Sequence, residues 1–144
     1  LREETGAGVM NAKAALDEFK GDFEKAKEKL LKMGIEKADK KKDREIKAGL
    51  VYSYIHGGDG ISGRVGVLVK VGCETDFVAK TEDFKTLCKE VAMQISAMDP
   101  KDTTELLEMD YIRDGSKKVS DLVKGLIAKV GENIVIDSFS RLSI

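Results

Sequence analysis

The chain has 144 residues, which is enough for one domain or two small ones. Hydrophobic residues make up 42% of it but aromatic residues only 6%, and there is no Trp, so any core must be largely aliphatic. The formal net charge of -1 excludes a global positive field that would steer the protein to nucleic acid.

Residues 1–34 are predicted to form a small unit of three helices. Apolar residues recur at helical spacing from Met10 to Phe19 and from Phe23 to Leu31. The glycines around Ala7 should break the first helix, and Gly34 should end the third. The first residues already have a helical pattern, so we expect a short segment to precede them. Three short helices bury little area, and the unit should be only marginally stable alone.

Residues 35–48 are rich in charge. Lysines and Arg44 alternate with acidic residues between Glu36 and Lys47. A nucleic-acid-binding arm would lack those acids, so the pattern favours a solvated helical linker.

The pattern changes to that of strands after Gly49. Residues 50–55 and 64–71 should pair as a hairpin around a glycine-rich loop. Helices are expected at 81–98 and 120–130, with one helical turn at 104–109. Residues 134–144 alternate like a final strand, with Phe139 or Leu142 facing inward and an irregularity near Ser138. The fold class is therefore α+β, with a three-stranded antiparallel sheet packed against helices over residues 49–144.

The turn after the second strand places an acid beside an aromatic residue. Thr75 can cap a helix that begins at Asp76, so Asp76 and Phe77 should lie in its first turn. From the residues alone, Phe77 either folds into the core or is held out for a partner, and composition favours the core.

Several enzyme-like patterns have simpler explanations. The G-x-G-x-x-G match at 58–63 is followed by a strand, whereas a dinucleotide site needs a helix there. His56 has no second histidine for a zinc site. Cys73 could serve as a nucleophile with His56, but we favour a small buried cysteine. Cys73 and Cys88 form no CxxC pair, so we expect a reducing, cytoplasmic location, with a mitochondrial or plastid one left open.

Three motifs, in the same order, resemble the translation elongation factor Ts family. They are Thr5 to Met10, Thr75 to Lys80 and Ile127 to Ile134, and together they span nearly the whole chain. The resemblance implies a module like a ubiquitin-associated domain at residues 1–34. It also implies a guanine-nucleotide exchange factor for elongation factor Tu, which performs no covalent chemistry and needs no cofactor of its own. The partner GTPase carries GDP or GTP and Mg²⁺.

The resemblance also implies roles for particular residues. Phe77 would be a wedge that enters the GTPase, with Asp76 acting near its Mg²⁺ and Thr75 and Val78 belonging to the same contact. The helical module would dock through Arg2, Val9 and Met10, and the turn at Val130 and Gly131 would lie on the same contact face. The family commonly has two methionines where this chain has Val9 and Met10, which weakens the expected anchor.

Many family members carry a second sheet unit or an extra helical hairpin, and neither is visible here. The chain is then a short form or an N-terminal part, and the unpaired sheet edge would allow a homodimer.

Three alternatives stay open. They are a binding module like a ubiquitin-associated domain without exchange activity, a nucleic-acid binder using the lysines of 37–47, and a small hydrolase built on His56 and Cys73.

Overall fold

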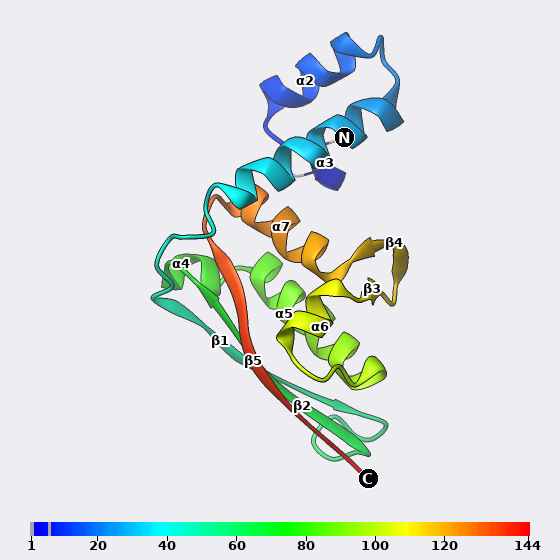
Figure 1. Cartoon of the computed structure of the whole chain (residues 1–144), viewed down its shortest axis with the longest axis vertical. Coiled ribbons are helices and arrows are strands. Elements are labelled where there is room, and N and C mark those ends of the chain that lie inside the picture. Colours follow the sequence, from blue (N-terminus) through cyan, green and yellow to red (C-terminus); the bar gives the residue numbers. More distant parts are fainter. Residues whose placement is uncertain (1, 6) are drawn as a thin grey trace.

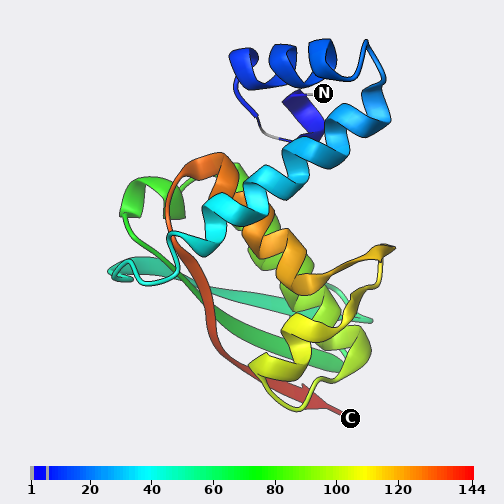
Figure 2. The same cartoon turned by 45° about the horizontal axis from the view of Figure 1, so that its top comes forward.

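The computed structural model describes residues 2–5 and 7–144, with the side chains of residues 2 and 3 left out. An N-terminal helical module lies at one end of the molecule, above a sheet that is covered by helices on one face (Figures 1 and 2). The module consists of α1 (Arg2–Thr5), α2 (Val9–Glu18) and α3 (Phe23–Asp39). Its likeness to a ubiquitin-associated domain stays a prediction.

The module has a small core of its own, made by Ala12, Ala15, Ala26 and Leu30. Asp22 caps α3 by accepting a hydrogen bond from the backbone N–H of Lys25 at 3.2 Å. The prediction that α3 ends at Gly34 is wrong, because the helix continues to Asp39. The second half of α3 packs on α7 (Val119–Val130), so this helix belongs to both the module and the rest of the chain.

The predicted hairpin and final strand are confirmed. A three-stranded antiparallel sheet has the order β1 (Ala48–His56), β2 (Val65–Cys73), β5 (Ile134–Ser143). The expected irregularity is also present: Lys70 pairs with Ser138 and Val71 pairs with Ile136, which leaves Asp137 as an extra residue in β5.

Helices cover the inner face of this sheet. They are α4 (Asp76–Ala79), α5 (Glu82–Met98), α6 (Thr103–Glu108) and α7. The main core joins Val67, Val69 and Val71 of β2 to Phe84, Val91 and Ile95 of α5. Thr81 caps α5 through the N–H of Phe84, and Gly131 ends α7 with a φ of 78°. The described part of the chain has no helix that is long and apolar enough to cross a membrane.

A short hairpin was not predicted from the sequence. Strands β3 (Asp110–Tyr111) and β4 (Asp114–Lys118) pair between α6 and α7. The buried side chain of Gln94 holds this hairpin to α5, because its amide donates to Asp110 O and its oxygen accepts from the N–H of Ile112, both at 3.0 Å.

The outer face of the sheet is not covered by any of the described helices. Of the two residues considered for the inner face, Phe139 packs against the core, whereas Leu142 is 80% exposed and points outward. Val51 and Leu68 are also exposed on this outer face. Strands β1 and β5 form the two edges.

Candidate partner-binding surface

A one-turn helix, α4, follows β2 directly and carries the predicted wedge. Thr75 is extended and caps α4, since its Oγ1 accepts from the N–H of Val78 at 3.4 Å. At the other end, Thr81 Oγ1 donates to Val78 O at 2.7 Å. The predicted helix start, with Asp76 and Phe77 in the first turn, is therefore confirmed. This turn lies at the end of the sheet that is nearer to the helical module (Figures 1 and 2).

The side chains of α4 divide sharply between solvent and core. Phe77 is 81% exposed, and Asp76 beside it is also exposed. Val78 and Ala79 are buried in the main core. Burial of these two residues fixes α4 against the sheet and directs Phe77 outward, although composition alone favoured a buried ring. The structure places Val78 inside, where it anchors the turn and presents no surface to a partner.

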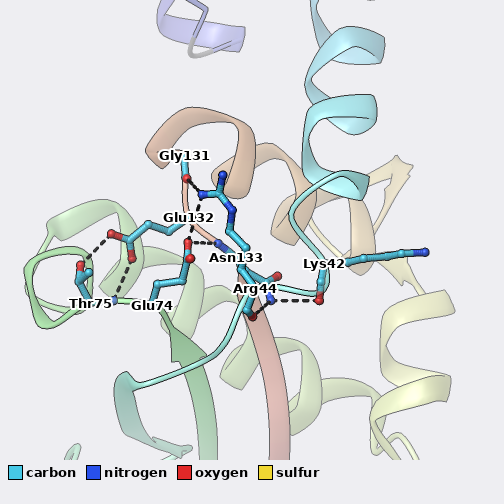
Figure 3. A network of polar contacts seen from close by, with 7 residues as sticks. All are labelled: Lys42, Arg44, Glu74, Thr75, Gly131, Glu132 and Asn133. Atoms are coloured by element: carbon cyan, nitrogen blue, oxygen red, sulfur yellow. Dashed lines mark hydrogen bonds and ion pairs between the residues drawn. The ribbon is translucent and has the colours of Figure 1, made fainter.

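The turn after α7 contacts the turn before α4. Glu132 accepts two hydrogen bonds from Thr75: one from the backbone N–H at 3.0 Å, and one from Oγ1 at 2.7 Å (Figure 3). Val130 and Gly131, which precede Glu132, are half-buried. Two of the three sequence motifs thus meet at this point, although 57 residues separate Thr75 from Glu132.

A second group of contacts ties the same turns to the segment that leaves the helical module. The backbone N–H of Asn133 donates to Glu74 Oε2 at 2.8 Å, and its side-chain amide donates to Lys42 O at 3.2 Å and Arg44 O at 2.9 Å. Arg44 donates to Gly131 O at 3.3 Å and lies 3.8 Å from Glu74 Oε2. Figure 3 shows these residues converging from three separate segments of the chain.

The sequence analysis did not assign roles to Glu74, Glu132 or Asn133. Glu132 and Asn133 lie within the quoted motif from Ile127 to Ile134, so the motif was a signal for them. Their hydrogen-bond partners lie in distant segments and could not be read from local spacing.

The predicted anchor lies at the start of α2. Val9 is 57% exposed and Met10 is 77% exposed, whereas Ala12 and Ala15 of the same helix are buried. The backbone of Arg2 lies in α1, but its side chain is outside the described residues. Exposed apolar side chains therefore occur at two places, at the start of α2 and on α4.

The structure removes the basis for a hydrolase built on His56 and Cys73. His56 pairs with Val65 at one end of β2 and Cys73 ends the other, so at about 3.3 Å per residue they lie about 25 Å apart. Burial raises the pKa of the Cys73 thiol, whereas a nucleophilic cysteine needs a lowered pKa. Nδ1 of His56 lies 2.8 Å from the hydroxyl of Tyr54.

The other enzyme-like patterns also have structural roles. The segment after the glycine-rich loop is β2, a strand, as predicted. Within the loop, a Cβ at Gly58 would meet Ser62 O and a Cβ at Gly63 would meet His56 O, so both glycines allow a tight hairpin end. The described residues contain no cluster of His, Cys, Asp and Glu that could hold a metal ion.

Comparison with known proteins identifies the family. A family model described as "Elongation factor TS" matches residues 74–144. Elongation factor Ts of Caldanaerobacter subterraneus subsp. tengcongensis is 42% identical, over 98% of this chain and 91% of its own length. The chain belongs to the elongation factor Ts family. The elongation factors Ts of Coprothermobacter proteolyticus and Thermotoga maritima are 40% and 39% identical over 100% of this chain, with 94% and 92% of their own lengths covered.

Within the aligned region, this chain has fewer residues than its relatives. The alignment with the Caldanaerobacter protein covers 186 residues against a chain of 144, so at least 42 of its positions face gaps in this chain. Despite those gaps, both the helical module and the sheet unit lie within the aligned part.

Proposed function

We propose that this chain is a guanine-nucleotide exchange factor for elongation factor Tu, and that it promotes GDP release by inserting Phe77 into the GTPase. The observation that carries the proposal is the position of Phe77. Its ring is 81% exposed on a helical turn whose next two residues are buried. A large apolar side chain that is exposed to solvent beside buried neighbours is typical of a partner anchor.

Exchange by such a factor follows from linkage between two binding events. The exchange protein must bind nucleotide-free Tu more tightly than GDP-bound Tu. The ratio of these two affinities equals the fold by which it weakens the binding of GDP to Tu. No covalent step is required of this chain. Burying a Phe side chain contributes about 1.5–3 kcal/mol. If that contact forms only in the nucleotide-free complex, Phe77 alone accounts for about a tenfold to hundredfold weakening of GDP.

Asp76 acts beside the wedge. Among the described residues, its carboxylate makes no hydrogen bond or ion pair, so it is available to a partner. Mg²⁺ requires nearly ideal octahedral geometry, and a carboxylate brought close to its water ligands would loosen it. Asp76 thus disturbs the Mg²⁺ and phosphate site of the GTPase while the ring of Phe77 inserts beside that site.

The helical module supplies the remaining contact. The nucleotide-binding domain of Tu binds Arg2, Val9 and Met10, and the turn at Val130 and Gly131 belongs to the same contact face. The helical module then supplies binding to Tu, and α4 supplies the contact that promotes GDP release.

The test is GDP release from Tu, followed with a fluorescent GDP analogue. We expect the wild-type chain to accelerate release, and Phe77→Ala to lower the maximal rate by about tenfold or more. Ile61→Ala is the matched control, because Ile61 is 89% exposed at the tip of the β1–β2 loop, and it should leave release unchanged. Binding to Tu without faster GDP release would favour the alternative, a binding module without exchange activity.

We also propose that two copies of the chain can pair through the sheet edge. Among the described residues, no strand pairs with the outer side of edge strand β1 or of edge strand β5, and unpaired edges favour association. A solution mass of two chains that falls to one chain in a Leu142→Lys variant would support pairing at β5. A single-chain mass at all concentrations would refute it.

A further inference from the structure

We infer that Glu132 is a positioning residue for Phe77, acting through Thr75. The inference rests on the proposed function and deepens it, because it names the group that holds the wedge in its productive orientation. Glu132 comes from the α7–β5 turn, on the opposite side of the contact from α4 (Figure 3).

Helix α4 cannot hold its own shape. It has four residues. Forming a single helical turn costs the conformational entropy of several backbone dihedral angles and gains only about one hydrogen bond. Buried Val78 and Ala79 anchor one side of it. Its N-terminal side depends on Thr75, whose cap hydrogen bond to the N–H of Val78 is long, at 3.4 Å. A weak cap of this kind needs support from outside the helix.

Glu132 supplies that support at two atoms of Thr75. A threonine hydroxyl has one proton and two lone pairs. Oγ1 of Thr75 gives its proton to Glu132 Oε2 at 2.7 Å, which leaves a lone pair for the N–H of Val78. The backbone N–H of Thr75 donates to Glu132 Oε1 at 3.0 Å, so the same carboxylate restrains both the side chain and the main chain of the cap. Hydrogen bonds to a carboxylate are stronger than those to neutral acceptors.

The position of Glu132 is itself restrained. Gly131 ends α7 in a left-handed conformation, and its carbonyl accepts from Arg44. On the other side, the buried residue Asn133 is held by Glu74 and by two carbonyls of residues 42–44. The carboxylate of Glu132 therefore projects from a turn that several hydrogen bonds hold in place, toward the cap of the one-turn helix α4.

Removing the carboxylate should lower the fraction of molecules that present Phe77 correctly. The apparent affinity for a partner falls in proportion to the competent fraction, whereas the rate within the complex is unchanged once Phe77 has entered. We therefore expect Glu132→Ala to raise the concentration of chain that half-saturates GDP release from Tu by about threefold to tenfold, with the same maximal rate. Phe77→Ala, in contrast, should lower the maximal rate.

Four variants test this inference in the full chain. They are Glu132→Ala, Glu132→Gln, Phe77→Ala and the Glu132→Ala, Phe77→Ala double variant, with Glu105→Ala on α6 as the control for loss of an exposed glutamate. Glu132→Gln keeps one acceptor oxygen and should fall between wild type and Glu132→Ala. If Glu132 acts through Phe77, removing Glu132 in the Phe77→Ala background should change nothing further. Additive effects would overturn the inference.

A second readout needs no Tu. Amide hydrogen exchange at Val78 and Ala79 should become faster in Glu132→Ala and less so in Glu132→Gln. Unchanged exchange at these amides would also overturn the inference. If Tu releases GDP as fast with Phe77→Ala as with the wild-type chain, the proposed function fails. If Phe77→Ala is impaired but Glu132→Ala has wild-type half-saturation, only the role of Glu132 fails.

Discussion

Gly34 of α3 lies directly against Ala128 of α7, so closely that a Cβ at Gly34 would be 3.2 Å from the Cβ of Ala128. The two helices approach at a point where neither has a large side chain. Gly34 therefore allows the module-bearing helix to pack on the rest of the chain, and it does not end that helix.

Enlarging Gly34 should weaken this packing. We expect Gly34→Leu to lower the free energy of unfolding by about 1–3 kcal/mol, because the larger side chain forces α3 away from α7. Gly125, also in α7, is the matched control, since a Cβ there would meet nothing within 4 Å. Gly125→Ala should raise stability by up to about 1 kcal/mol through helix propensity alone. Urea unfolding measures both, and a Gly34→Leu variant as stable as wild type would contradict the packing role.

Val9 and Met10 at the start of α2 should affect the affinity for Tu more than the maximal rate of GDP release. Replacing Val9 and Met10 together by Ser should raise the half-saturating concentration in GDP release by about tenfold, because exposed apolar anchors contribute mainly to affinity. Stability should change little, since both residues are exposed. Met98→Ser, which alters an exposed methionine at the end of α5, is the control. An unchanged half-saturating concentration in the double variant would exclude α2 from the contact.

The two cysteines should be unreactive in the folded protein. Burial raises the pKa of the Cys88 thiol to about 12, and it also raises the pKa of Cys73. Because the thiolate is the reactive form, a disulfide reagent at about pH 8 should label neither residue in the native chain and both in denaturant. Rapid labelling of native Cys73 would contradict this and would revive a nucleophilic role for it.

Tyr111 should make the protein lose stability at alkaline pH. Burial, and then the hydrogen bond to Glu90 Oε2 at 2.6 Å, raises the pKa of the Tyr111 hydroxyl to about 12. An unfolded tyrosine titrates near a pKa of about 10, so between about pH 10 and 12 the unfolded state binds fewer protons than the native state. This contribution to stability is complete below that window and is lost as the pH rises through it.

The comparison that isolates this effect is with Tyr111→Phe. Urea unfolding at about pH 9 and about pH 11 should show a larger loss of stability in wild type than in the variant, because Phe has no proton to lose. Equal losses in the two proteins would assign the alkaline effect to other groups.

Local chemistry in the sequence predicted much of this fold. The cap at Thr75 depends on a side chain and a backbone N–H only three residues apart. Strand and helix periodicities likewise extend over single elements, so the hairpin, the final strand and α5 and α7 could be recognised. The turn that carries Asp76 and Phe77 was located for the same reason.

Other features depended on which elements meet in space. Gly34 has the same local signature whether it ends a helix or admits a neighbouring one, and only the position of α7 distinguishes the two. Val78 was grouped with the partner contact, yet packing against the sheet unit placed it in the core. The β3–β4 hairpin is held by the buried amide of Gln94, which no local pattern indicates.

The sequence alone therefore determined most of the elements, the cap at Thr75 and the motifs that mark the family, because these depend on residues a few positions apart. Only the tertiary structure decided that Phe77 faces solvent and that Glu132 holds its cap, since both follow from contacts between segments far apart in the chain. Burial and long-range hydrogen bonding are properties of the assembled fold, and short-range spacing does not specify them.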